Sequence, residues 1–175
     1  MSKGVKMKKT AVTGILISVL FLFGAGFLFA EDDIQKHPSC KYCGMDRKQF
    51  AHSRIFINYD DGTTMGTCSL HCAAIDLAIH IDKTPKMIQA GDYSEKALID
   101  AEKAQWVIGG SKMGVMTKRA KWAFGKKEDA EKFIKENGGG IATFDQAMKA
   151  AYEDIYDDTK MIRERRKMRK MQHNK

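Results

Sequence analysis

The chain has 175 residues, a length that suits one ordinary domain or two small ones with a modest core. Hydrophobic residues make up 43% and charged residues 30%, which is ordinary for a soluble fold with an added apolar segment. Its net charge of +8 is confined to the ends, because residues 1–30 carry +4 and residues 160–175 carry +7, which leaves −3 for residues 31–159. A domain that binds the phosphate backbone of a nucleic acid needs a basic surface, whereas residues 31–159 are slightly acidic. We therefore expect no nucleic-acid partner.

Residues 1–30 have the pattern of an export signal or a signal anchor. Four lysines precede twenty uncharged residues, 11–30, and acidic residues follow. Ala30 suits the position before a cleavage site, but Leu28, two positions earlier, is larger than the small residue preferred at that place. Twenty apolar residues also reach the length of a membrane-spanning helix. A cleaved signal and a membrane anchor through residues 11–30 both stay open. Either one predicts that the body lies in the periplasm or on the outer face of the cytoplasmic membrane.

Residues 36–93 are expected to form a module of two strands, a helix and a further strand (ββαβ). Alternating apolar residues over 55–59, a tight turn and a second strand up to Cys68 predict a hairpin. A helix follows, with Ser69 placed to cap it, and residues 85–93 supply the last strand.

A second ββαβ module is expected over residues 105–147, after a linker rich in Ser, Glu, Lys and Ala, residues 94–104. Residues 105–124 predict two strands around a Gly-Gly break, and residues 126–139 predict a short amphipathic helix closed by glycines. Residues 148–175 predict a helix that passes into a solvated basic tail, with an arm for a membrane surface or a partner as the alternative. The predicted fold class is therefore α+β, with two small related ββαβ modules after an N-terminal apolar helix.

Four cysteines, at positions 40, 43, 68 and 72, are the chain's clearest chemical signal. An even number in an exported protein first suggests disulfides. The spacing of Cys40 and Cys43 also suits a metal ion, because two thiolates can converge from one turn, and Cys68 and Cys72 share a face at the start of the predicted helix. The set could close a tetrahedral zinc site, and the sequence leaves open whether the second pair binds metal, forms a disulfide or packs.

Methionines near the cysteines favour a softer ion than zinc. Met45 follows the C-x-x-C pair, and Met113 and Met116 lie in a glycine-flanked bend. These three serve no periodic apolar face, unlike Met87 and Met148, whose spacing is typical of core packing. Thiolate and thioether ligands together select Cu(I). The remaining methionines of the C-terminal tail have no expected role: Met161, Met168 and Met171.

Five motifs occur in the order "CKYCGM", "YDDGTTMGTCSLHC", "KMGVMTKRAKWAF", "KKEDAEKFIKENGG" and "ATFDQ". With them, residues 36–147 resemble the NosL family of copper-binding proteins associated with nitrous-oxide reductase assembly. The resemblance implies an exported Cu(I) chaperone built from two ββαβ modules, and a copper-accepting enzyme or assembly factor as its partner. The copper ligands that it implies are Cys40, Cys43, Met45 and Met116, with Met113 as a neighbour.

Two other functions stay open. A membrane-tethered dithiol oxidoreductase could use Cys40 and Cys43, although thioredoxin-like proteins place such a pair at a helix start within a βαβ pattern. The four cysteines could instead hold structural zinc. No hydrolytic site is expected, because Asp60 and Asp61 suit a turn and no carboxylate is evident that would orient the histidines at 52, 71 and 80. We therefore expect that the protein is not an enzyme. We also expect it to be a monomer.

Overall fold

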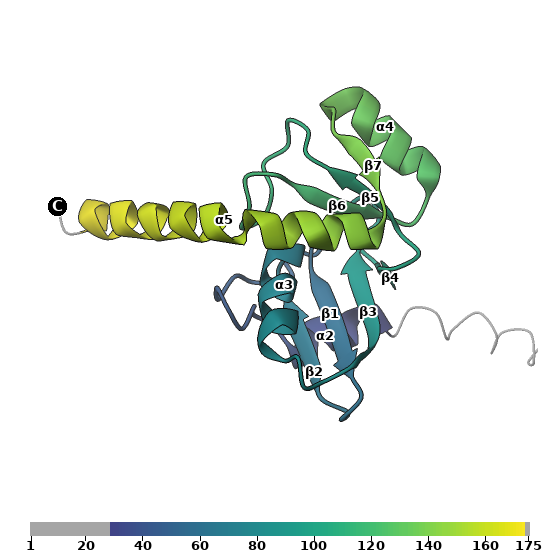
Figure 1. Cartoon of the computed structure of the whole chain (residues 1–175), viewed down its shortest axis with the longest axis horizontal. Coiled ribbons are helices and arrows are strands. Elements are labelled where there is room, and N and C mark those ends of the chain that lie inside the picture. The colour runs from purple at the N-terminus through teal and green to yellow at the C-terminus, as the bar shows by residue number, and fades with distance from the viewer. Residues whose placement is uncertain (1–28, 174–175) are drawn as a thin grey trace, which may run out of the picture.

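The computed structural model of the protein describes residues 29–173, and these residues form a mixed fold of helices and antiparallel strands (Figure 1). The predicted N-terminal apolar segment lies outside the described residues, except for its last two positions. Within 29–173, no helix has both the length and the apolar character that a membrane span requires. The described chain begins with a short helix, α2 (Phe29–Lys36).

The first module is an antiparallel sheet with one helix. A hairpin of β1 (Ile55–Tyr59) and β2 (Thr64–Thr67) leads into α3 (Leu70–Ile79), and β3 (Pro85–Gly91) returns on the other side of β1. The strand order is β2-β1-β3, extended at the β3 edge by β4 (Leu98–Asp100). The predicted order of strand, strand, helix and strand is thus found here.

The segment that was predicted to be a linker, residues 94–104, belongs to this sheet. Its strand β4 pairs with the end of β3, and Ala101 and Ala104 are buried. Ile99 packs against the apolar core. The linker prediction was wrong here because the Lys and Glu side chains that suggested a linker occupy only the exposed positions of the segment.

The second module repeats the arrangement with three strands. β5 (Gln105–Ile108) pairs with β6 (Lys121–Phe124) on one side and with β7 (Gly140–Ala142) on the other, and α4 (Lys127–Asn137) connects β6 to β7. The order β6-β5-β7 matches β2-β1-β3, since the first strand of each module is central. The modules differ in their hairpin loops, which have four residues between β1 and β2 but twelve between β5 and β6.

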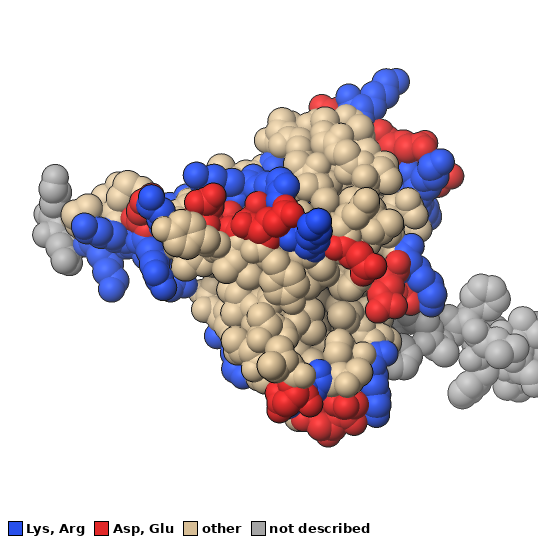
Figure 2. Space-filling view, in the orientation of Figure 1, with Lys and Arg blue, Asp and Glu red and all other residues tan. Residues whose placement is uncertain are grey.

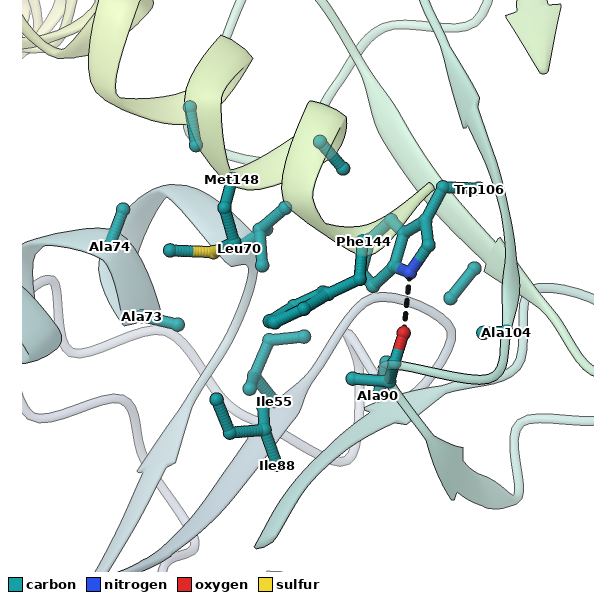
Figure 3. Close-up of a cluster of buried hydrophobic side chains, with 14 of the residues drawn as sticks. Ile55, Leu70, Ala73, Ala74, Ile88, Ala90, Ala104, Trp106, Phe144 and Met148 are labelled. Carbon is teal, nitrogen blue, oxygen red and sulfur yellow. Dashed lines mark hydrogen bonds between the residues drawn. The ribbon is translucent and has the colours of Figure 1, made fainter. Parts of the chain in front are cut away.

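The long helix α5 (Phe144–His173) joins the two modules. It packs against α3 and β5, and Phe144 and Met148 from its first turns enter an apolar cluster with Ile55 and Trp106 (Figure 3). The core role predicted for Met148 is therefore confirmed, whereas the same prediction was wrong for Met87 of β3, which is 42% exposed. The Trp106 indole N–H is also satisfied, because Nε1 donates a hydrogen bond to the carbonyl oxygen of Ala101 at 2.8 Å. Both modules thus share one core under α5.

The second half of α5 projects from the body of the protein (Figure 1). The helix continues without a break to His173, whereas the sequence predicted that it would pass into a solvated tail. Arg, Lys, Met, Gln and Glu dominate this stretch, and all of them have high helix propensity. The basic segment is consequently an ordered helix over residues 160–173.

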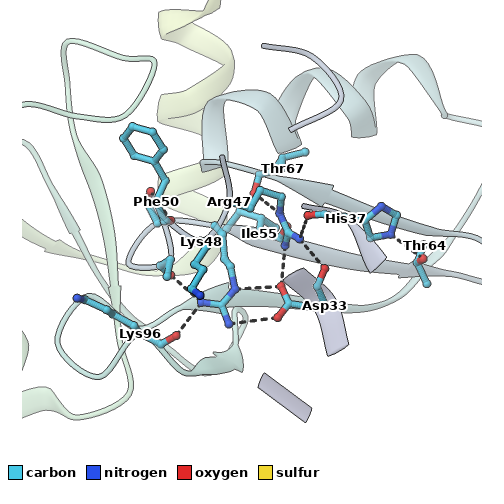
Figure 4. A network of polar contacts seen from close by, with 12 residues as sticks. Asp33, His37, Arg47, Lys48, Phe50, Ile55, Thr64, Thr67 and Lys96 are labelled. Carbon is cyan, nitrogen blue, oxygen red and sulfur yellow. Dashed lines mark hydrogen bonds and ion pairs between the residues drawn. The ribbon is translucent and has the colours of Figure 1, made fainter. Parts of the chain in front are cut away.

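A buried carboxylate, Asp33 of α2, holds the start of the described chain against the first sheet (Figure 4). It accepts hydrogen bonds from Arg47 Nη2 at 2.7 Å and from Arg54 Nε at 2.9 Å, and all three side chains are at most 2% exposed. The Arg47 side chain lies against Gly66 of β2, where a Cβ would stand 2.7 Å from the guanidinium. A residue other than glycine at this position would therefore displace the ion pair.

We expect Asp33→Asn to lower the free energy of unfolding by about 3–5 kcal/mol, because it leaves two buried guanidiniums without a counter-charge. Urea unfolding followed by circular dichroism measures this loss. Asp157→Asn is the matched control, since Asp157 is exposed on α5 and makes no ion pair within residues 29–173. Equal unfolding midpoints for the two variants would contradict the role assigned to Asp33.

Candidate metal centre

The C-x-x-C segment forms a tight loop between α2 and the first sheet. The backbone N–H of Gly44 donates to the carbonyl of Cys40, and the N–H of Cys40 donates to the carbonyl of Met45, both at 2.8 Å. Gly44 has φ +76°, in the left-handed region that favours glycine. The loop closes on itself and brings Cys40 Sγ and Cys43 Sγ within 4.8 Å of each other.

The second cysteine pair stands where β2 passes into α3. Cys68 precedes the helix, Cys72 lies in its first turn, and their sulfurs are 3.8 Å apart. The partial positive charge of a helix N-terminus favours thiolates at this place. Ser69 occupies the predicted N-cap position, but its side chain makes no capping hydrogen bond and its Oγ lies 3.9 Å from Cys68 Sγ instead.

All four cysteine sulfurs converge on one point between these two segments. They lie within 4.8 Å of one another, and Cys43 Sγ is 3.3 Å from Cys68 Sγ. All four are free thiols, since a disulfide would need about 2.05 Å. A tetrahedral site with metal–sulfur distances of about 2.3 Å has sulfurs about 3.8 Å apart. The cluster therefore has the dimensions to hold one metal ion, and it includes Cys68 and Cys72, whose role the sequence left open.

The four thiols differ in acidity and in burial. Hydrogen bonds from Cys43, Cys68 and Cys72 lower the pKa of Cys40, whereas hydrogen bonding to Cys40 and the other thiols, together with burial, raises the pKa of Cys72. Cys40, Cys68 and Cys72 are each at most 1% exposed, and Cys43 is half-buried. Cys43 is therefore the sulfur through which the cluster reaches the surface.

Cys43 lines a cavity of about 350 Å³ bounded by both modules and α5. Met45, Met113 and Met116 line the same cavity, so the structure brings together all the methionines that the sequence singled out. Met45 and Met116 pack against the cluster of buried residues that contains Cys40, Cys68 and Cys72, while Met113 is 72% exposed. Met116 has φ +60°, a costly conformation for a residue with a side chain, and such conformations are often found at functional sites. Three thiols are thus buried, and Cys43 lies beside the thioethers that line the cavity.

Sequence reasoning missed several other residues of the cavity. Met161 of α5, to which no role was assigned, is 8% exposed and lines it. His52 also lines it, and burial, with the charge of Lys96, lowers the His52 pKa, which favours the neutral ring. The spacing of Ile155 and Ile162 could have shown that α5 keeps an inward face this far. Three arginines of α5 complete the wall: Arg165, Arg166 and Arg169.

Tyr42, between the first two cysteines, ties their loop to α3. Its hydroxyl donates a hydrogen bond to the buried carboxylate of Asp76, which also accepts one from the hydroxyl of Tyr59 at 2.5 Å. Burial and the hydrogen bond to Asp76 raise the pKa of Tyr42 above the usual range, so its hydroxyl stays protonated. The loop and the helix that carry the four thiols are thereby joined through one carboxylate.

Two histidines do have carboxylate neighbours, contrary to the sequence expectation. His80 Nδ1 lies 3.3 Å from Asp76 Oδ1, one helical turn away, and His71 Nδ1 lies 3.4 Å from Asp158 Oδ2. The expectation was wrong for His71 because its partner comes from α5, which is distant in sequence. Neither histidine lines the cavity beside Cys43.

Comparisons with known proteins agree with this architecture. Residues 31–152 match the family model described as NosL. Among solved structures, the copper chaperone NosL from Shewanella denitrificans is similar, with 24% sequence identity and a TM-score of 0.50 over 61% of this chain and 87% of that chain. No curated protein matches the chain. The structural likeness supports the fold, in which two antiparallel sheets are followed by a C-terminal helix.

We expect Tyr42→Phe to lower the free energy of unfolding by roughly 1–3 kcal/mol, because it removes a hydrogen-bond donor from a buried carboxylate. Thermal and urea unfolding of the metal-free protein measure the change. Tyr156→Phe is the matched control, since Tyr156 is 78% exposed. A Tyr42 variant as stable as the control would show that the loop is held without Asp76.

Proposed function

The chain belongs to the NosL family, and we propose that it is an exported Cu(I)-binding chaperone that passes copper to another protein. The observation that carries this proposal is the four-thiol cluster whose half-buried member, Cys43, lines a cavity with Met45, Met113 and Met116. Thiolate and thioether ligands select Cu(I) among the common protein-bound metals. The structurally similar protein from Shewanella denitrificans is described as a copper chaperone, which supports copper as the metal.

Copper is the cargo in this proposal. Cys43 and Cys40 would be inner ligands of the ion, with Cys68 and Cys72 completing the thiol set, and Met45, Met113 and Met116 would offer thioether ligands along the cavity through which it enters or leaves. At every transfer one metal–sulfur bond forms while another breaks, so the ion remains bound by sulfur and keeps its oxidation state. No reaction is catalysed, and the burial of three thiols shields the ion from water.

Release requires that a partner's sulfur can attack the bound ion. A closed site with four equally buried cysteines would retain its metal, as structural zinc sites do. Here the cluster has one exposed edge, because Cys43 is half-buried beside a cavity whose lining includes thioethers. An acceptor's ligand could therefore reach the ion at Cys43 while the buried thiols still hold it from behind.

We place this exchange outside the cytoplasmic membrane, in the periplasm or on the outer membrane face, because residues 1–30 have the pattern of an export segment. If the segment is retained, residues 11–30 would anchor the protein in the membrane. The proposed acceptor is a copper enzyme such as nitrous-oxide reductase, or its assembly factor, as the family resemblance implies. One chain contains the whole cluster, so a monomer suffices for the exchange.

Structural zinc is the second candidate, and the sulfur separation within the second cysteine pair fits it. Cys68 Sγ and Cys72 Sγ are 3.8 Å apart, as in an ideal tetrahedral thiolate site, where the separation is about 3.8 Å. In this alternative the four thiols hold one Zn²⁺, the methionines are incidental, and removal of the metal unfolds the protein. The two candidates therefore predict different metals and different behaviour of the metal-free chain.

We expect the anaerobic, reduced protein to bind one equivalent of Cu(I) more tightly than Zn(II), in competition with chelators of known affinity. Cys40→Ser/Met116→Ala should lose tight Cu(I) binding. Met116→Ala alone should weaken it at least about tenfold, the lower limit of what the loss of even an outer-shell contact costs a metal site. Its unfolding midpoint without metal should stay unchanged.

The matched control is Met87→Ala, because Met87 is 42% exposed on β3 and does not line the cavity. Zinc that copurifies at one equivalent and whose removal unfolds the chain would overturn the chaperone proposal in favour of the structural site. Cu(I) binding that tolerates both cavity variants would also count against it.

A further inference from the structure

Helix α5 supplies one wall of the cavity beside Cys43, and this wall is strongly basic. Arg165, Arg166 and Arg169 line it together with Met161, whereas no Asp or Glu of residues 29–173 does. These arginines lie beyond residue 152, where the match to the family ends.

Buried polar contacts fix α5 next to the cavity. Lys121 Nζ lies 2.7 Å from Asp154 Oδ2, and the backbone N–H of Lys118 donates to Asp158 Oδ1 at 3.0 Å. Lys118 lies in the β5–β6 loop that also carries Met113 and Met116, and Lys121 is the first residue of β6 after it. Arg165 and Arg169 follow Met161 by one and two helical turns, so they continue the same face of the helix. The three arginines are exposed, and their side chains line the same cavity as the thioethers.

This arrangement does not suit a free Cu(I) cation. Lys and Arg gather on the projecting end of α5 (Figure 2), and a cavity with guanidiniums and no carboxylates repels cations and attracts anions. Copper that reaches Cys43 through this cavity must therefore arrive with ligands that reverse its charge. The volume of about 350 Å³ falls within the range of small-molecule sites, so such a carrier can be small.

We propose that the cavity binds a small anionic Cu(I)–thiolate complex whose ligands bear carboxylates, with Arg165 and Arg169 pairing with the carboxylates while Cys43 takes the metal. This inference rests on the proposed function and names the form in which the cargo arrives. In the exchange, Cys43 Sγ forms a bond to Cu(I) as one carrier thiolate–copper bond breaks. The thiol proton of Cys43 passes to the departing thiolate, and copper remains Cu(I) throughout.

Three thiols of similar size and different charge test the proposal. In Cu(I) complexes with two thiolate ligands, 3-mercaptopropionate gives the most anionic carrier, 2-mercaptoethanol a less anionic one and cysteamine a cationic one. Transfer to the full-length protein is followed anaerobically by the ultraviolet sulfur-to-copper absorption. We expect the mercaptopropionate complex to deliver copper at least about tenfold faster than the cysteamine complex at low salt. The difference should shrink as ionic strength rises.

The matched variants are Arg165→Gln/Arg169→Gln and Arg163→Gln/Lys167→Gln. Each removes two positive charges one turn apart on α5, but Arg163 and Lys167 lie outside the cavity. The first variant should lose the preference for the anionic carrier and keep its equilibrium affinity for Cu(I), whereas the second should keep both.

Two outcomes would overturn the proposal, and they are distinguishable. If Cu(I) affinity is intact but both variants transfer copper from the three carriers at the wild-type rates, this inference fails and the proposed function stands. In that case the arginines serve another contact, such as the acidic surface of a partner protein. A wild-type protein that binds no Cu(I) would remove the proposed function and this inference together.

Discussion

The geometry of the candidate metal centre depends on the hydrogen bonds that the buried guanidinium of Arg47 donates. Arg47 follows the C-x-x-C loop directly, and its Nε donates to the carbonyl of Thr67, one residue before Cys68. Its remaining four N–H groups reach the backbone carbonyls of Asp33, His37 and Ile55 and the carboxylate of Asp33. All five donors of the side chain are used, which offsets the cost of burying the charge. One buried side chain therefore attaches both cysteine pairs to each other and to α2.

The two related modules contribute different chemistry to the site. The first supplies all four thiols, from the loop before β1 and from the start of α3. In the second, the corresponding helix α4 begins with Lys and acidic residues instead, but its hairpin loop is three times as long and carries Met113 and Met116. A soft metal site at the junction of the modules thus arises from one short sequence motif and one lengthened loop.

The local pattern of the sequence was sufficient to predict the strands and helices of both modules, but it did not predict which residues meet at the candidate site. Alternation over Ile55–Tyr59 and the glycines that follow α4 predicted the repeated order of strands and helices, because these signals act over a few residues. The convergence of Cys40 with Cys72, and the place of Met161 in the cavity, depend on how α3 and α5 pack. Such contacts between distant segments leave no periodic trace in one sequence. Met161 and the arginines after it were therefore taken for part of a solvated tail.

Retention and release of a metal ion make opposite demands on a site, and this fold separates them in space. Three buried thiols, anchored through Tyr42, Asp76 and Arg47, have little freedom to rearrange, which favours tight binding. The fourth thiol lies at the edge of a cavity whose wall is partly an exposed loop and partly a projecting helix. Changes to that wall can alter how the ion enters or leaves without disturbing the buried thiols.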